Sequence, residues 1–176
     1  MMTDHLKWPT NPRILEINTW ARLTELSKRR DQEITLKNVP KEVIVRGLKH
    51  FDAAWLMGVW EISPRGKEIA SKHIDLKKDF RKALDDLKSE DIVGSPYAVH
   101  QYKVDDNLGG EEGLGTFRKH LNEQEMILIL DFVPNHVAID HPWTKNHPEM
   151  FVQGSEEELS EKPDDYFQVG ETIIAN

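Results

Sequence analysis

The chain has 176 residues, of which 38% are hydrophobic and 31% are charged, and its formal net charge is −8. This composition is that of a globular chain with one sizeable core, and the lack of a Lys/Arg block argues against a nucleic-acid partner. The absence of Cys excludes disulfides and thiolate-bound metals, and without an apolar N-terminal leader or a run of 18 apolar residues we expect a cytoplasmic location with no membrane contact.

The first third of the chain predicts an arm followed by alternating strands and helices. Residues 1–12 are polar with two Pro residues and are expected to form a loose arm. Residues 13–18 predict a short strand, and the apolar spacing within 19–30 predicts one or two helical turns. A helix beginning with Pro is expected over 40–50, because Pro suits the first helical position. The nearly continuous apolar run at 51–60 is typical of a strand covered on both faces.

The rest of the chain continues this alternation and then becomes polar. Residues 76–88 carry apolar side chains at steps of four and three, which predicts an amphipathic helix. The Gly- and Pro-rich stretch 94–110 predicts an ordered loop, and 111–125 a further helix. Residues 126–133 again predict a strand covered on both faces. The acidic segment 137–176 is expected to be loop-rich, to end without a closing element, and to present its run at 156–165 to solvent.

Strands that alternate with helices predict a parallel sheet with crossover connections. The pattern alone leaves a doubly wound sheet and an eight-stranded barrel open. A complete barrel of this type takes about 250 residues. With three convincing strands, this chain is not expected to close one.

Polar residues follow the last predicted strand at "MILILDFVPNH", where Asp131, Asn135 and His136 lie. In parallel α/β folds, residues just beyond the carboxyl end of a strand are the usual site material. A purely structural role is the alternative, in which Asp131 caps a turn and His136 binds backbone. A metal site that also uses Asp140 and His141 is a further hypothesis, since carboxylate and imidazole suit several divalent ions.

Three Trp residues near the predicted strands have two interpretations as well. Trp20, Trp55 and Trp60 could serve as sugar platforms, because indole faces suit the C–H face of a sugar. Aromatic residues in or beside apolar runs are more often part of the core, and this interpretation is favoured for Trp55.

Five segments, in order, resemble the α-amylase family, glycoside hydrolase family 13. "DFVPNH" is similar to the family's first conserved region, which lies on the third strand of its catalytic barrel. The other segments are "LEINT" at 15–19, "FDAAWLMGVWEISPRG" at 51–66, "GSPYAVHQYKVDDNLGGEEGL" at 94–114 and "HPWTKNHPEMFVQ" at 141–153.

The resemblance implies a fold class and a domain division. The fold would be α/β, a partial (β/α)8 TIM barrel of about the first three βα units, over residues 13–136. Residues 137–176 would be the start of the inserted loop domain. The implied function is hydrolysis or transfer of α-glucosidic bonds in an α-glucan or oligosaccharide.

Carried over residue by residue, the resemblance assigns roles at the sugar subsite next to the cleaved bond. Asp131 would support this subsite by holding an Arg on the next strand, and His136 would hydrogen-bond the sugar. Tyr97 would stack beneath the sugar ring. Asn135 matches a position that binds structural calcium in many family members, and no other cofactor is implied.

The carboxyl groups that cleave the bond lie on later strands of the family barrel, outside the segments that match here. Retaining hydrolysis needs two carboxyl groups about 5 Å apart, and nothing in the sequence places Glu61, Asp131 or Asp140 in such a pair. We therefore expect this chain alone to be inactive and the remainder of the barrel to be a partner. Two alternatives are a non-catalytic carbohydrate-binding or complex-forming half-barrel, and a small metal-dependent hydrolase built on Asp131, His136 and His141.

Overall fold

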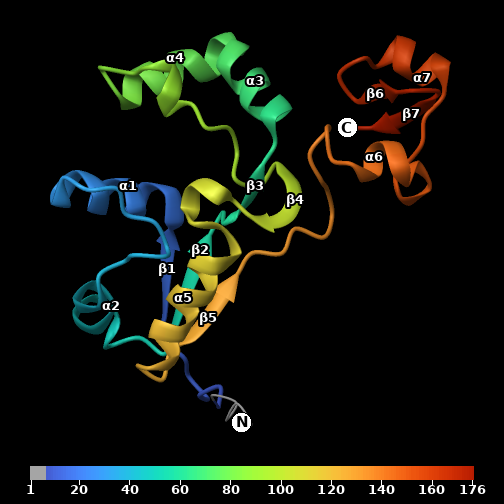
Figure 1. Cartoon of the computed structure of the whole chain (residues 1–176). Helices are drawn as coiled ribbons and strands as arrows, with labels where there is room; N and C mark the ends of the chain where they lie inside the picture. The colour runs from blue at the N-terminus through green and yellow to red at the C-terminus, as the bar shows by residue number, and fades with distance from the viewer. Residues whose placement is uncertain (1–6) are drawn as a thin grey trace. The chain divides into compact units, whose positions relative to one another are not determined.

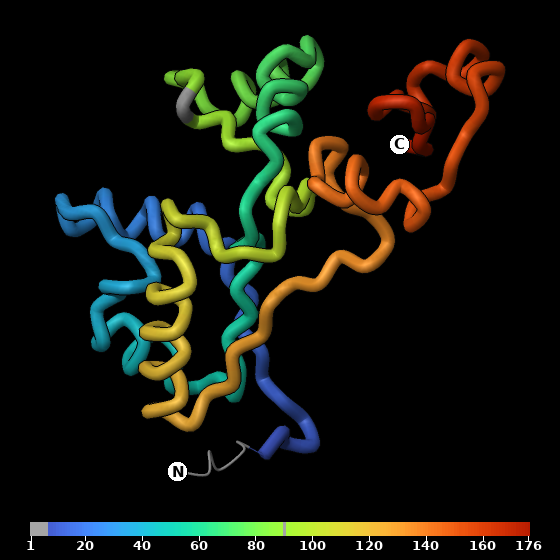
Figure 2. Tube along the Cα trace, turned by 45° about the vertical axis from the view of Figure 1, so that its right-hand side comes forward, coloured from blue at the N-terminus to red at the C-terminus, as the bar shows by residue number. Residues whose placement is uncertain are grey.

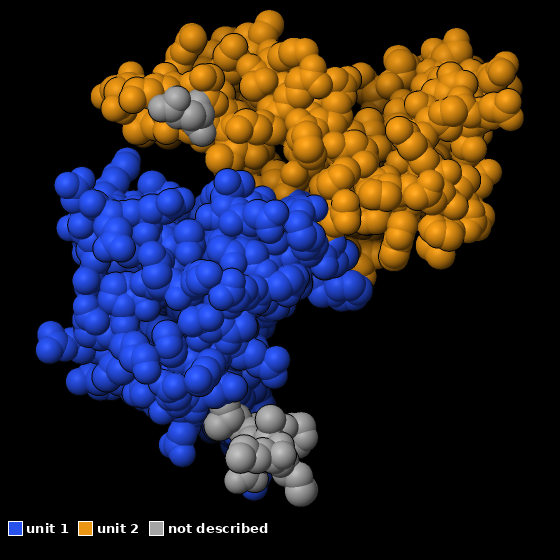
Figure 3. All heavy atoms as spheres, viewed as in Figure 1, with its two compact units in different colours: residues 1–61, 102–132 blue, residues 62–101, 133–176 orange. Residues whose placement is uncertain are grey.

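A computed structural model describes residues 7–176, with the side chain of Glu90 excepted, so residues 1–6 of the predicted arm lie outside the described residues. The chain divides into two compact units (Figure 3). Unit 1 comprises residues up to 61 together with 102–132, and unit 2 comprises 62–101 together with 133–176. Each unit is therefore built from two separate stretches of the chain, and the predicted division at residue 136 stays a prediction.

Unit 1 is organised by a three-stranded parallel sheet in the order β1-β2-β5 (Figure 1). These strands are β1 (Ile14–Asn18), β2 (Ala53–Met57) and β5 (Ile127–Leu130). Leu56 pairs with Ile17 on one side and with Leu130 on the other, so the carboxyl ends of all three strands lie at one edge. The predicted strands and their parallel pairing are confirmed.

Three helices accompany this sheet: α1 (Thr19–Arg30), α2 (Lys41–Leu48) and α5 (Gly110–Asn122). Figure 2 shows the yellow helix α5 leading directly into β5. Helix α1 runs for 12 residues, longer than the one or two turns predicted. It is capped at its start by the Asn18 side chain, which accepts a hydrogen bond from the Ala21 N–H, and basic residues in its last turn suit the helix dipole.

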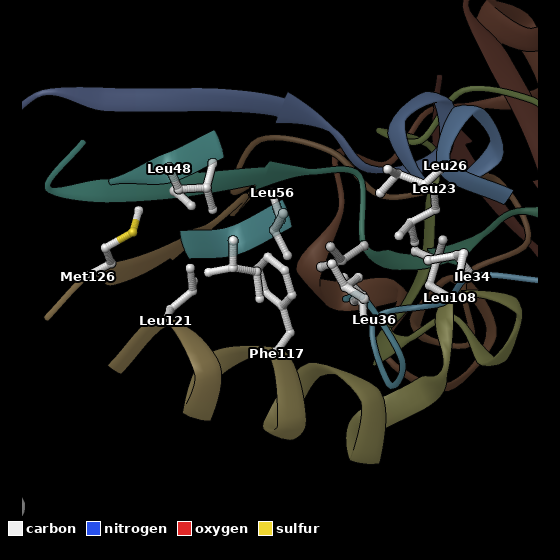
Figure 4. Close-up of a cluster of buried hydrophobic side chains, with 14 residues drawn as sticks. Leu23, Leu26, Ile34, Leu36, Leu48, Leu56, Leu108, Phe117, Leu121 and Met126 are labelled. Carbon is white, nitrogen blue, oxygen red and sulfur yellow. The ribbon is translucent and has the colours of Figure 1, made fainter. Parts of the chain in front are cut away.

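The hydrophobic core of unit 1 lies between the sheet and these helices. In Figure 4, Phe117 and Leu121 of α5 point toward Leu56 of β2. Burial of such apolar side chains supplies the main favourable free energy of folding. The buried members of this cluster are Leu23, Leu26, Ile34, Leu36, Val39, Ile44, Leu48, Ala54, Leu56, Val59, Leu108, Phe117, Leu121 and Met126.

The segment predicted as a loop over 94–110 contains a strand, so that part of the prediction is wrong. Strand β4 (Val99–Val104) pairs with β3 (Trp60–Ile62) in a two-stranded sheet, and the short 3-10 helix η2 (Asp106–Leu108) follows. Val99 and Val104, at the two ends of β4, are almost fully buried. The Gly and Pro residues that suggested a loop lie before and after this strand rather than within it.

Unit 2 begins with a pair of helices, α3 (Pro64–Lys72) and α4 (Ile74–Ala83), and a 3-10 turn, η1 (Ser89–Asp91). The helix predicted over 76–88 is confirmed in its first part and ends at Ala83. The chain leaves the helix at Leu84, which adopts an extended conformation. Ser63 caps α3, its hydroxyl accepting a hydrogen bond from the Gly66 N–H.

The acidic second stretch of unit 2 is more ordered than predicted. It holds α6 (Trp143–Asn146), η3 (Pro148–Met150), α7 (Glu156–Glu161), β6 (Tyr166–Val169) and β7 (Thr172–Ala175). Strands β6 and β7 form an antiparallel hairpin, so the prediction that this stretch lacks a closing element is wrong.

The hairpin turns at Gly170, whose positive φ of 61° suits a residue without Cβ. No helix in the described part of the chain is both long enough and apolar enough to cross a bilayer.

Candidate functional site

Asp131 leaves strand β5 at the shared carboxyl edge of the unit 1 sheet and is 8% exposed. Its Oδ1 accepts a hydrogen bond from the Trp55 indole Nε1 at 2.7 Å, and its Oδ2 accepts one from the Gly58 N–H at 2.5 Å. A buried carboxylate requires such donors, because an unpaired charge in the interior costs several kcal/mol. Asp131 thus joins the exit of β5 to β2.

Gly58 is held from both sides. Its carbonyl accepts a hydrogen bond from the Trp20 indole Nε1 at 2.9 Å, while its N–H binds Asp131. Its φ is 68°, a left-handed conformation that suits glycine. The Thr19 hydroxyl donates to the neighbouring Met57 carbonyl at 2.7 Å, which ties the start of α1 to the end of β2. We call Trp20, Trp55, Gly58 and Asp131 the strand-exit cluster.

The three Trp residues near the strands therefore have structural hydrogen bonds. Trp20 and Trp55 belong to the strand-exit cluster, and the Trp60 Nε1 donates to the Asp131 carbonyl at 2.9 Å. Trp60 also contacts the Tyr102 ring at 5.3 Å between centroids, and Tyr102 contacts Phe132 at 5.8 Å. These indole partners were missed by the sequence reasoning, although Gly58, within the apolar run at 51–60, was a signal of special backbone.

The other predicted site residues belong to unit 2. Tyr97 is half-buried, and its N–H donates to the Ser95 hydroxyl at 3.2 Å. Asn135 and His136 are exposed neighbours, with the Asn135 Oδ1 and the His136 Nδ1 3.2 Å apart. The structure thus brings Asn135 and His136 together, whereas Asp131 is described with the other unit.

Asn135 and His136 lie on the wall of a groove of about 380 Å³ in unit 2. Its other walls carry aromatic and aliphatic side chains, and Tyr97 is not among the described residues that line it. The polar or aromatic lining residues are Asn135, His136, Trp143, Thr144, Phe151 and Phe167. A concave, mostly apolar surface with a few polar groups is the usual form of a small-ligand site.

Asp140 fastens the loop after β5 to the start of helix α3. Its Oδ1 accepts a hydrogen bond from the Ser63 hydroxyl at 2.6 Å, its Oδ2 accepts one from the Arg65 N–H at 3.0 Å, and the His100 Nδ1 lies 3.6 Å from Oδ1. Burial acts to raise the pKa of Asp140, but the hydrogen bonds from Ser63 and Arg65 outweigh it and lower the pKa below its usual value. The adjacent His141 is buried, and desolvation lowers the pKa of its imidazole.

The lowered pKa of Asp140 predicts a pH-dependent attachment of this loop. A carboxyl whose folded-state pKa is depressed stabilises the fold above its unfolded-state pKa, near 3.8, and loses that contribution as pH falls through the lower folded-state value. The free energy of unfolding of the wild type should therefore exceed that of Asp140→Asn at pH 6, and the gap should shrink as pH falls from 5 to 2. Urea titrations of both proteins across this range measure it, and a constant gap would contradict the assignment.

The structure offers little support for a metal site. The described residues contain no group of three or more His, Cys, Asp or Glu side chains that could hold a metal ion. The described residues thus contain no ligand cluster of the kind that the metal hypothesis built on Asp131, His136, Asp140 and His141 requires. The calcium role of Asn135 stays a prediction.

The three carboxylates considered as possible acids are each engaged elsewhere. Asp131 and Asp140 accept the hydrogen bonds described above, and the Glu61 Oε1 lies 2.8 Å from the Lys103 Nζ. A general acid or nucleophile must reach the substrate with its oxygen atoms. Within this chain, each of the three carboxylates thus already has a hydrogen-bond donor or a cation beside it.

Comparison with known proteins identifies the relatives of this chain. A sequence model of the α-amylase catalytic domain matches residues 75–173. An α-glucosidase of Schizosaccharomyces pombe is 32% identical over 108 residues, which are 57% of this chain and 19% of that protein. An α-amylase from Lactobacillus plantarum superposes with a TM-score of 0.50 at 17% identity, over 93% of this chain and 31% of that one.

These likenesses show the fold class and how much of each relative the chain spans. The chain spans about a fifth of the α-glucosidase and about a third of the α-amylase structure. At 17% identity the structural likeness shows the fold alone, which is part of a TIM-barrel-type α/β fold. The predicted fold class is confirmed at this level, and the exact number of βα units stays a prediction.

Proposed function

Because this chain belongs to the α-amylase family, we propose that it forms part of the catalytic barrel of a glycoside hydrolase that hydrolyses or transfers α-glucosidic bonds. The observation that carries the proposal is the match to the catalytic-domain model over 75–173, which includes the exit of β5 at Asp131 and most of the residues that line the groove. The substrate class is an α-glucan or a shorter α-linked oligosaccharide.

Within this proposal the predicted site residues bind sugar rather than break bonds. His136, exposed on the groove wall, hydrogen-bonds a sugar hydroxyl, since imidazole both donates and accepts. Tyr97 stacks beneath a sugar ring. For Asp131 we keep the predicted role of holding an Arg of the next strand, and within unit 1 its carboxylate joins the exits of β2 and β5.

We further propose that these 176 residues alone do not cleave a glycoside. The engaged state of Glu61, Asp131 and Asp140 supports this, because retaining hydrolysis needs one carboxylate as nucleophile and another as acid and base. The same observation favours a second candidate, a non-catalytic carbohydrate-binding chain. A measurement of glycoside hydrolysis distinguishes the part of a glycoside hydrolase from the non-catalytic carbohydrate-binding chain.

The test compares two proteins in the same assay: the 176-residue chain and the product of the complete reading frame that encodes it. Release of 4-nitrophenol from 4-nitrophenyl α-glucoside and of reducing ends from maltoheptaose is measured, with the β-glucoside as the control. The complete product should hydrolyse the α-linked substrates only, and the 176-residue chain should release nothing above buffer. Hydrolysis of the β-glucoside alone, or of neither, would contradict an α-glucosidic enzyme.

A variant of the complete product refines this test. His136→Ala should lower kcat/KM for maltoheptaose by roughly 5- to 150-fold, since leaving a buried hydroxyl of the bound sugar without its hydrogen-bond partner costs about 1–3 kcal/mol. His50→Ala, at an exposed position of unit 1, is the matched control and should leave kcat/KM within twofold. An unchanged kcat/KM in His136→Ala would remove His136 from the site.

A further inference from the structure

Trp143 presents a half-exposed indole on the same groove that carries His136. It is 47% exposed and begins helix α6, just after the loop that Asp140 fastens. Core tryptophans bury most of their surface, as large apolar side chains do in this chain's core. An indole left open on a concave surface is therefore available to a ligand.

The indole is also held in place before any ligand binds. The backbone N–H of Trp143 donates a hydrogen bond to the His141 Nδ1 at 3.1 Å. The indole ring of Trp143 meets the His141 ring edge to face, at 5.1 Å between centroids. His147 packs on the ring as well, at 6.5 Å with planes 89° apart. His141 is 5% exposed and so gives a fixed support. Pre-ordering of a ring in this way reduces the entropy that binding must overcome.

The groove combines the two kinds of surface that a sugar ring requires. Pyranose rings have C–H faces that stack on aromatic rings and hydroxyl edges that need hydrogen-bond partners. Trp143 and Phe151 provide aromatic surface, and the exposed Asn135 and His136 provide donors and acceptors on the same groove. The volume of about 380 Å³ lies within the usual range of small-ligand sites.

We propose that Trp143 is the stacking platform for a glucosyl unit of the α-linked substrate, with His136 and Asn135 binding its hydroxyls. The proposal rests on the proposed function and deepens it, because it assigns to Trp143 an aromatic stacking contact, a kind of contact that the sequence resemblance gave only to Tyr97. Tyr97 does not line this groove among the described residues, whereas Trp143 lines it together with His136 and, unlike the phenylalanines there, presents a half-exposed indole.

The test measures binding of maltoheptaose to the 176-residue chain by calorimetry and by NMR of the indole N–H signals. Trp143→Ala should weaken binding about tenfold or more, and Trp143→Phe should restore most of the affinity because it keeps an aromatic face. Trp8→Ala is the matched control, since Trp8 is 48% exposed but belongs to unit 1, and it should bind like the wild type. Saturation transfer from sugar protons to the Trp143 ring in the wild-type chain supplies a readout that needs no variant.

Each outcome decides the proposal. Weaker binding in Trp143→Ala with normal binding in Trp8→Ala supports it, as does saturation transfer to Trp143. Equal affinity in Trp143→Ala, or no binding of maltoheptaose by the wild-type chain, overturns it. Neither of these two results decides the proposed function, which is tested separately by hydrolysis with the complete reading-frame product.

Discussion

Asp131→Ala is expected to lower the free energy of unfolding of unit 1 by about 3–5 kcal/mol, because it leaves a buried backbone donor and a partly buried indole donor without their acceptor. Hydrogen bonds to a charged group contribute about 1.5–3 kcal/mol each, and the carboxylate accepts from both the Trp55 Nε1 and the Gly58 N–H. Urea unfolding followed by tryptophan fluorescence measures this loss.

Two further variants give that experiment its control. Asp131→Asn keeps the shape and one acceptor oxygen but turns an amide NH2 toward the second donor, so its loss should approach that of the alanine variant. Asp85→Ala, at an exposed position, should change the free energy of unfolding by less than about 0.5 kcal/mol. A loss below about 1 kcal/mol in both Asp131 variants would show that the strand-exit cluster is not holding the strand ends together.

Gly154→Ala is expected to destabilise unit 2 by about 1–3 kcal/mol, the usual range for overpacking a filled site. A Cβ at this position would lie 2.6 Å from two carbons of the Tyr166 ring. The ring cannot turn away freely, because the Tyr166 hydroxyl lies 3.2 Å from the Glu158 Oε1, to which it donates. Thermal or urea unfolding of the variant measures the effect.

The matched control is a glycine with open space around it. Gly115 lies inside α5, where an added Cβ meets nothing within 4 Å, so Gly115→Ala should raise stability by up to about 1 kcal/mol. In addition, Tyr166→Ala should suppress most of the effect of Gly154→Ala in a double-mutant cycle. Equal stability changes in Gly154→Ala and Gly115→Ala would contradict the contact between Gly154 and the Tyr166 ring.

The parallel sheet could be predicted because its signal is local and strong. The apolar runs at 51–60 and 126–133 read as strands buried on both faces, and the intervening helices carry apolar stripes. Strands β4, β6 and β7 were missed because they lie among Gly, Pro and acidic residues. The formation of these strands depends on their pairing partners. Strand β4 pairs with β3, and β6 and β7 pair with each other.

The candidate site was only partly within reach of the sequence. Asp131, Asn135 and His136 could be located because they follow a recognisable strand, but their partners are distant in the chain. Trp55 is 76 residues from Asp131 and carried only an apolar signal. Trp143 had no periodic pattern around it, and its place on the groove follows from the packing of α6 with the β6–β7 hairpin segment.

The separation between Gly58 and Asp131 has a consequence for biosynthesis. Their hydrogen bond joins residues 73 positions apart, and residues 62–101 of unit 2 are synthesised between the two stretches of unit 1. At about 5–20 residues per second, a ribosome needs roughly 4 to 15 s to add those 73 residues. During that interval the nascent β1 and β2 lack the acceptor that closes their ends, so the growing chain must tolerate an unfinished sheet, a state in which chaperones commonly act.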